Sequence, residues 1–187
     1  MKFFLILISL LFTNSCSSNY NWGWYILDPT LDQGYTNIKF LLSGLWLTIS
    51  ISLISIILSL ILGFLIALPG FSKNKILKFL NRLYIEVFRS IPLLVLLLWI
   101  YYGLPVVFGI SLGAFTAGVI SLSLSDSAFE AEIFRAGLQA INLGQKDAAK
   151  SIGLNKYQEM RLIVLPQAVK VILPAIGNQF VYVLKMS

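Results

Sequence analysis

The sequence predicts an all-α fold, a polytopic bundle of transmembrane helices. Of its 187 residues, 58% are hydrophobic and only 12% are charged, whereas about 25% of an ordinary soluble domain is charged. Several uncharged runs exceed the roughly 20 residues that a helix needs to cross a bilayer, and the basic residues fall into blocks between these runs. A small soluble globule could not bury so many long apolar runs, so the composition favours a bundle embedded in lipid.

The composition also limits the chemistry of the chain. A net charge of +6 would suit a nucleic-acid partner, but basic blocks between apolar runs are the pattern of membrane topology, so we expect no nucleic acid. The sequence has no histidine, which excludes a Ser/His/Asp triad and a histidine-ligated metal. The single cysteine, Cys16, excludes an internal disulfide. We therefore expect no catalytic residue and no metal site.

The N-terminal residues 1–16 look like a secretory signal. Lys2 precedes an apolar run from Phe3 to Phe12 that is too short to span a membrane. The residues that end at Cys16 are reminiscent of a lipoprotein cleavage box, and cleavage or lipidation there stays open. Residues 17–37 are expected to form an extracytoplasmic segment with interfacial aromatic anchors at Trp22, Trp24, Tyr25 and Tyr35.

Residues 38–187 are expected to form the transmembrane domain, and its first span covers about 40–69. The chain carries no charge from Phe40 to Ser72. The next segment, 71–89, has five basic residues against the single acidic Glu86: Lys73, Lys75, Lys78, Arg82 and Arg89. By the positive-inside rule, this segment is cytoplasmic.

Three further spans complete the predicted topology. An uncharged run from Ser90 to Ser125 is interrupted by a stretch rich in glycine around Pro105, which predicts spans at about 86–104 and 111–131 joined by an outside turn. The last span, about 162–184, is broken only by Lys170. The loop before it is again basic, which places both basic blocks on the cytoplasmic side: Lys146, Lys150, Lys156 and Arg161.

Two separated segments resemble one family. Asp147-Ala148-Ala149, followed by Gly153 and later by Leu165-Pro166, resembles the EAA loop of bacterial ABC importer permeases. Asp147 stands where the family has glutamate, and it keeps the negative charge at the start of a helix. Upstream, Arg89-Ser90-Ile91-Pro92 looks like the Arg-Gly-Thr-Pro motif of the polar amino-acid branch. The likeness covers about residues 36–187.

This resemblance implies the transmembrane permease subunit of an ATP-driven amino-acid importer, a multi-pass protein of the bacterial inner membrane. The implied partners are a separate ABC ATPase subunit, an extracytoplasmic amino-acid-binding protein, a second permease subunit, identical or different, and membrane lipid. The chain itself would be no enzyme and hold no cofactor, because ATP would be bound by the ATPase and the sequence has no phosphate loop. Family members usually continue past the position of Ser187, so we expect a bundle truncated before its last span.

The loop at 145–166 is the expected link to the ATPase. Ala148, Ala149 and Ile152 share one side of a predicted helix, and Gly153 can end that helix in the left-handed conformation. In the family, this helix seats in a cleft of the ATPase. The resemblance assigns this coupling to seven residues: Asp147, Ala148, Ala149, Ile152, Gly153, Leu165 and Pro166. The alternative is a plain amphipathic helix on the membrane surface.

Charged residues near the spans are candidates for a translocation pathway. Asp126 should face protein or a watery passage, because a carboxylate in hydrocarbon costs about 2.5 to 3.5 kcal/mol, unless it already lies at the cytoplasmic interface. Glu130 and Arg89 are the other pathway candidates, although Arg89 could instead pair with Glu86 or bind lipid phosphate. Glu132 and Arg135 are expected to form a structural ion pair.

A function from another class stays open at this point. A secondary transporter or channel fragment would need no ATPase, and the presence of a neighbouring gene for a phosphate-loop ATPase would discriminate between the two. The sequence leaves open which amino acid is carried, since a binding protein usually selects it.

Overall fold

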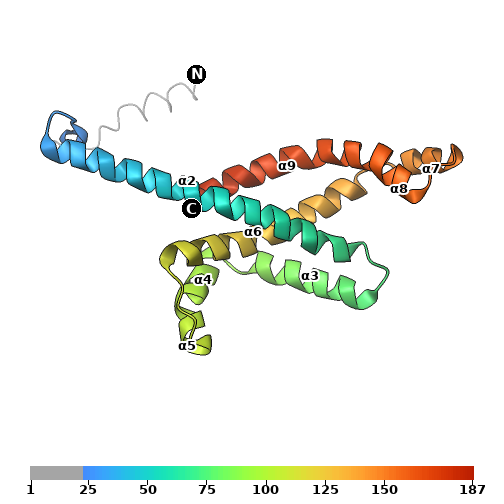
Figure 1. The fold of residues 1–187 in the computed structure, drawn as a ribbon, viewed down its shortest axis with the longest axis horizontal. Coiled ribbons are helices and arrows are strands. Elements are labelled where there is room, and N and C mark those ends of the chain that lie inside the picture. Colours follow the sequence, from blue (N-terminus) through green and yellow to red (C-terminus); the bar gives the residue numbers. More distant parts are fainter. Residues whose placement is uncertain (1–22) are drawn as a thin grey trace, which may run out of the picture. The chain divides into compact units, whose positions relative to one another are not determined.

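The computed structural model describes residues 23–187, and every regular element among them is a helix. The expected signal-like segment, with Cys16, lies outside the described residues. The chain divides into two compact units, residues 1–44 and 45–187. The helical segments, shown in Figure 1, are η1 (Trp24–Leu27), α2 (Asp32–Gly70), α3 (Lys75–Ser90), α4 (Leu93–Leu98), η2 (Trp99–Gly103), α5 (Leu104–Phe108), α6 (Ala114–Gln139), α7 (Leu143–Ser151), α8 (Lys156–Glu159), η3 (Met160–Val164) and α9 (Leu165–Met186).

The described part of the first unit is a turn packed on the beginning of α2. The Asp28 carboxylate accepts hydrogen bonds from the amide and the hydroxyl of Thr30, at 3.0 and 2.7 Å, and these bonds lower the pKa of Asp28. Asn37 on α2 donates to the Ile26 carbonyl at 3.0 Å. A Cβ atom at Gly34 would lie 1.8 Å from the Asp28 carbonyl oxygen, so only glycine permits this close contact.

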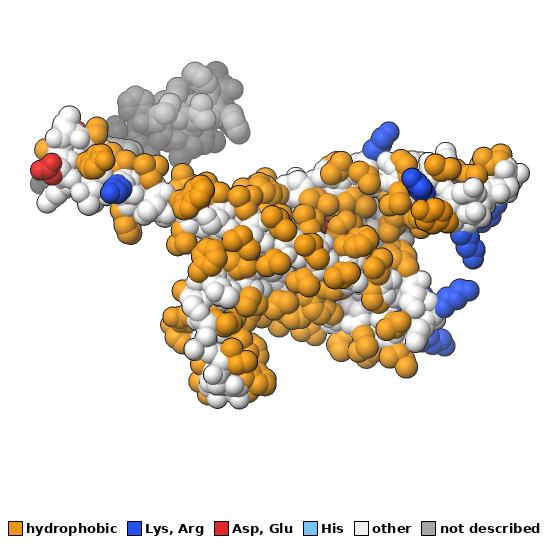
Figure 2. Space-filling view, in the orientation of Figure 1, with side chains coloured by type: hydrophobic (Ala, Val, Ile, Leu, Met, Phe, Trp, Pro, Cys, Tyr) orange, Lys and Arg blue, Asp and Glu red, His pale blue; other side chains and the backbone are white. Residues whose placement is uncertain are grey.

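Two helical stretches within residues 23–187 are long and apolar enough to cross a membrane. They are α2, with 39 residues, and the continuous stretch from α8 to α9, with 31 residues. Among the described residues, α3 and the stretch from α4 to α5 supply a third span if this bent pair is counted as one. Helix α2 includes the first expected span, 40–69, and the fourth, 162–184, begins within η3 and continues along α9. On the visible face of the second unit, hydrophobic side chains cover most of the surface, and Lys and Arg gather where α3 begins and α7 lies (Figure 2).

A sharp bend breaks the second expected span. Ile91 precedes Pro92, and a residue before proline is pushed out of the helical region; its backbone is extended, with φ −83° and ψ 123°. The axes of α3 and of the following helical stretch consequently differ by 99°. The apolar helix of this span begins at Leu93, rather than at about residue 86 as the sequence suggested, because residues 86–90 complete α3.

Helix α6 covers the third expected span but is too polar to qualify as a span by hydropathy. Serines, together with Asp126 and Glu130, lower its mean hydropathy. Most of these polar residues are buried, because α6 packs against α3, α4 and α9 and exchanges hydrogen bonds with α2. A helix enclosed by its neighbours need not be apolar on every face, and this is why its hydropathy falls below that of α2.

Each π-helical turn stands directly before a proline. η2 is followed by Leu104-Pro105, and η3 by Leu165-Pro166. A proline inside a helix removes one N–H donor, and its ring clashes with the carbonyl four residues earlier. That carbonyl belongs to the π turn in both cases, and the wider turn accommodates the ring. The helix can therefore continue through both prolines without a break.

Small residues bring α2 and α6 into close contact. Ser55, Ser59, Gly63 and Ala67 follow one another at four-residue intervals and so form one stripe along α2. A Cβ atom at Gly63 would lie 2.5 Å from the Cβ of Glu130. This seam holds the two helices at a distance that only small side chains allow.

Candidate functional site

Helix α7 forms a defined unit of the loop between α6 and α9. At its start, the side chain of Asn142 caps the helix by accepting from the Gly144 amide at 2.8 Å. At its end, Gly153 takes the left-handed conformation with φ +81°. The amides of Gly153 and Leu154 donate to the carbonyls of Lys150 and Ala149, at 3.0 and 3.1 Å. This is a Schellman motif, in which glycine avoids the cost of a Cβ atom.

The chain then turns directly into the last span. Asn155 and Gln158 form a reciprocal capping box, in which each side chain accepts from the backbone amide of the other, at 2.9 and 3.0 Å. This box starts α8, which continues through η3 into α9. Since α7 packs against α8 and η3, a force applied to α7 has a short, packed route to the α9 span. Leu165 and Pro166 are the first residues of α9.

Only part of the face of α7 that the sequence predicted to contact the ATPase is accessible. Ala149 is only 1% exposed, because α8 and η3 fold back on that side of the helix. Ala148 and Ile152 are exposed, so the accessible surface is narrower than the sequence predicted. Asp147 lies at the surface and pairs with Lys150 at 3.0 Å, and this contact raises the pKa of Lys150.

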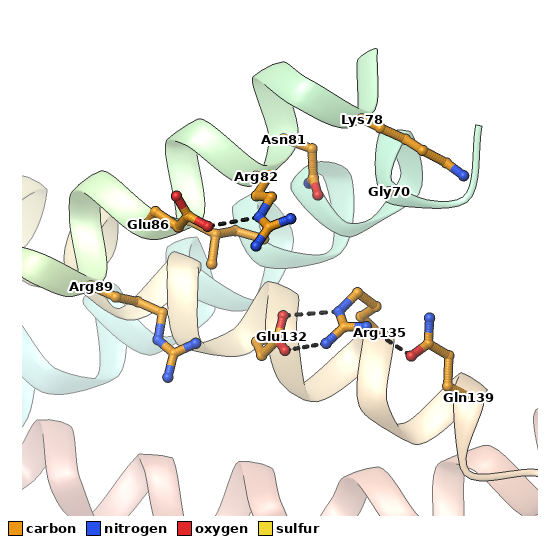
Figure 3. Close-up of a pocket in the computed structure, with 10 residues that line it drawn as sticks. Gly70, Lys78, Asn81, Arg82, Glu86, Arg89, Glu132, Arg135 and Gln139 are labelled. Carbon is orange, nitrogen blue, oxygen red and sulfur yellow. Dashed lines mark hydrogen bonds and ion pairs between the residues drawn. The ribbon is translucent and has the colours of Figure 1, made fainter. Parts of the chain in front are cut away.

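A charged cavity of about 530 Å³ lies between α3 and α6 (Figure 3). Its α3 wall includes Lys78, Arg82, Ile85 and Arg89, which recur at i, i+4, i+7 and i+11 and therefore share one face of the helix. Its α6 wall carries the ionic residues Glu132 and Arg135 in the same way, at i and i+3. The cavity thus brings together charged side chains that the sequence separates by more than forty residues.

Ion pairs neutralise only part of this charge. Arg82 contacts Glu86 at 2.7 Å, and Arg135 binds both carboxylate oxygens of Glu132. Within residues 23–187, neither Lys78 nor Arg89 forms a salt bridge. The cavity lining holds four cations and two carboxylates, a formal excess of +2.

Arg89 is positioned by an aromatic ring and not by a carboxylate. Its guanidinium carbon lies 5.1 Å from the centroid of the Phe129 ring, within the range of a cation–π interaction. The Glu86 pairing that the sequence left open does not form, because Glu86 is engaged by Arg82 one turn earlier on α3. The guanidinium N–H donors of Arg89 keep their capacity to bind an anion.

The other two pathway candidates do not line this cavity. Asp126 is 3% exposed and Glu130 is 1% exposed. The Asp126 carboxylate accepts from Ser59 on α2 at 2.6 Å and from Gln179 on α9 at 2.5 Å, so it faces protein and ties three helices together. The Oε2 atom of Glu130 has no hydrogen-bond partner among the described residues. Of the three candidates, the structure brings only Arg89 to the cavity.

Sequence reasoning missed the other cavity residues. Lys78 and Arg82 served only as evidence for topology, and Glu86 otherwise only as a possible partner of Arg89, although the spacing of 78, 82, 85 and 89 places three cations on one side of a helix. That period was visible in the sequence. The opposing wall from α6 was not, because it depends on how the two helices pack.

Residues 59–187 match the family of binding-protein-dependent transport system inner membrane components. The chain belongs to this family. As such an inner membrane component, it is a transport permease with the all-α fold that the sequence predicted. Its resemblance to ABC transporter permeases in the sequence is thereby confirmed.

Named relatives and solved structures agree with this membership. A Rickettsia prowazekii protein named for a glutamine transport system permease is 37% identical over 153 residues, covering 82% of this chain and 70% of its own length. The arginine transport system permease protein of Bacillus subtilis is 40% identical over 150 residues, with 80% and 68% covered. The crystal structure of an amino acid ABC transporter is 43% identical with a TM-score of 0.75, covering 81% of this chain and 72% of that one. An inward-facing methionine ABC transporter, at 24% identity and a TM-score of 0.63, shares the fold.

Proposed function

We propose that this inner membrane component is the permease subunit of an ATP-driven amino-acid importer in the bacterial cytoplasmic membrane, and that α7 couples it to a separate ATPase. The names of the relatives support amino acids as cargo, since they include glutamine and arginine systems. The ATPase would bind ATP, so the chain would need no cofactor of its own. A second permease subunit and an extracytoplasmic amino-acid-binding protein would complete the assembly.

The geometry of α7 is the observation that carries this proposal. The helix is capped at both ends, presents Ala148 and Ile152 to solvent, and packs on the turn that leads into α9. A small residue beside an exposed apolar one allows a partner surface to approach closely. This packed connection to α9 would supply what coupling requires, because displacement of α7 would move a membrane span.

The cavity between α3 and α6 would be this subunit's contribution to the translocation pathway. Charged side chains beside membrane spans are costly unless they face protein or water, and this cavity gathers six of them. Passage would be driven by conformational change in the assembly, without covalent chemistry in this chain.

Two substitutions test the coupling role of α7. Ala148→Trp places a large ring on the exposed side of α7, and Gly153→Val forces a β-branched residue into a left-handed conformation, which is strongly disfavoured. We expect each to reduce co-purification of the ATPase by about tenfold, which corresponds to about 1.4 kcal/mol. The amount of permease in the membrane should stay unchanged, because both residues lie outside the spans.

Matched controls make the same chemical changes far from α7. Ala114→Trp alters an exposed alanine at the opposite end of α6, and Gly177→Val alters a glycine of α9 with no atom within 4 Å of its Cβ position. Both controls should retain the ATPase. Wild-type levels of ATPase with both α7 variants would refute the coupling role and leave a surface helix. If wild-type permease carries amino acids with no ATPase at all, the protein is a secondary transporter.

A further inference from the structure

The two faces of α3 have opposite character. Lys78, Arg82 and Arg89 line the cavity, whereas Ile76, Leu80, Leu83 and Val87 are exposed at 68%, 53%, 46% and 42%. The apolar set repeats with the same i, i+4, i+7 and i+11 spacing, shifted by two residues, which is about 200° around the helix. An exposed apolar face in a membrane protein suits lipid, whereas the cavity lies on the opposite side of α3, where this helix packs against α6.

The cations of that face, Lys78, Arg82 and Arg89, form a row along the helix. From Lys78 to Arg89 the helix rises by about 16 Å, and Arg82 lies between them. Arg82 and Arg135 are matched by Glu86 and Glu132. Lys78, at the beginning of this row, and Arg89, at its end, are the two cations that supply the formal excess of +2.

Arg89 has the properties of an anion-binding residue. The Phe129 ring holds the guanidinium at 5.1 Å, which restricts its motion without neutralising its charge. A guanidinium presents its N–H donors in a planar fork that matches the two oxygens of a carboxylate. The cavity volume of about 530 Å³ is within the range of small-molecule sites.

We propose that the cavity between α3 and α6 is a binding site for small carboxylates, in which Arg89 binds the carboxylate and Lys78 attracts it into the cavity. This inference rests on the proposed function, because it names the cargo class of the same pathway. The cationic excess favours amino acids with a net negative charge, such as glutamate, over neutral ones and disfavours those with a net positive charge, such as arginine. The site would therefore discriminate among amino acids by their net charge.

Binding to the purified full chain in lipid nanodiscs tests this site directly, with radiolabelled glutamate, glutamine and arginine as probes. We expect saturable glutamate binding that is stronger than arginine binding. Arg89→Gln should weaken glutamate binding by about tenfold, as expected for loss of a hydrogen bond to a charged group, and Lys78→Gln should weaken it less. Arg89→Lys should restore part of the affinity, because it keeps the charge but loses the fork.

A charge-matched control separates a specific site from general attraction. Lys170→Gln removes one positive charge from an exposed position of α9 outside the cavity, and it should leave glutamate binding unchanged. Absence of saturable glutamate binding, arginine binding as tight as glutamate binding, or equal effects of Arg89→Gln and Lys170→Gln would each overturn the proposal.

The same variants in the assembled importer distinguish this inference from the proposed function. With one and the same binding protein, Arg89→Gln should lower the ratio of glutamate to glutamine uptake by about tenfold. ATP-driven uptake with an unchanged ratio would remove the carboxylate site and keep the importer. Saturable glutamate binding by the purified chain, combined with glutamate uptake that proceeds without any ATPase, would keep the site and remove the importer.

Discussion

Helix α6 carries two buried carboxylates, Asp126 and Glu130, and the surrounding helices provide hydrogen-bond donors to only the first in full. Asp126 accepts from Ser59 and Gln179, whereas Glu130 Oε2, equally enclosed, finds no hydrogen-bond partner in the part of the chain that the structure describes. A buried hydrogen bond contributes modestly to stability. Removal of its acceptor costs more, because the donor then stays buried without a partner. The two carboxylates, one turn apart, should therefore respond in opposite ways to removal.

Substitution of each carboxylate tests this contrast. Asp126→Ala leaves the Gln179 amide without its acceptor and should lower the free energy of unfolding by about 2 kcal/mol. Glu130→Met replaces an unsatisfied polar group by an apolar one of similar length and should leave stability unchanged or raise it. Thermal unfolding of both variants in detergent, beside wild type, measures the difference. Comparable destabilisation by the two substitutions would show that Glu130 contributes a stabilising contact.

The way in which neighbouring helices pack here depends on small residues and prolines at a few positions more than on helix propensity. The stripe of small residues on α2 brings its backbone against α6, and Gly63 marks the closest approach, where even a methyl group would contact Glu130. Likewise, the bend at Pro92 and the π turns before Pro105 and Pro166 follow from the stereochemistry of proline. Element geometry here comes from a few positions that either lack a side chain or constrain the backbone.

The α2–α6 seam can be tested with one methyl group. Gly63→Ala should lower the free energy of unfolding by about 1 to 3 kcal/mol, the usual cost of overpacking. Gly118→Ala, on α6 with nothing within 4 Å of its Cβ position, should be neutral or slightly stabilising, because alanine favours helix more than glycine does. Thermal unfolding in detergent again serves as the measurement. Equal stability of both variants and wild type would mean that the helices separate readily at Gly63.

Across the whole molecule, charge and hydropathy define an orientation in the membrane. Basic residues lie at Lys73, just before α3, along α3 itself, and again around α7 and α8, and both segments are expected to be cytoplasmic. The turn between α5 and α6 carries no charge from Gly109 to Gly113 and is expected outside. This orientation would place α7 on the side of the membrane where ATP is available.

Labelling of introduced cysteines from either side of the membrane tests this orientation. In a Cys16→Ser background, Lys78→Cys should react only with reagents that reach the cytoplasm, and Ile110→Cys should react with an impermeant reagent from outside. Both positions are exposed, so burial does not limit the reaction. Labelling of position 78 from outside would contradict the predicted topology.

The sequence alone determined features that depend on neighbouring residues. The apolar runs of α2 and α9 need only length and hydropathy, and the end of α7 at Gly153 needs only the freedom of glycine at positive φ. The tertiary structure decided features that join distant segments: Ser59 and Gln179 lie 67 and 53 positions from Asp126, and the cavity needs one wall from α3 and another from α6. It also decided that Ala149 is covered while Ala148 stays open, since two residues adjacent in sequence differ only in which helix folds over them. Local stereochemistry depends on consecutive residues and can be predicted from them, whereas contacts across helices depend on how the helices pack.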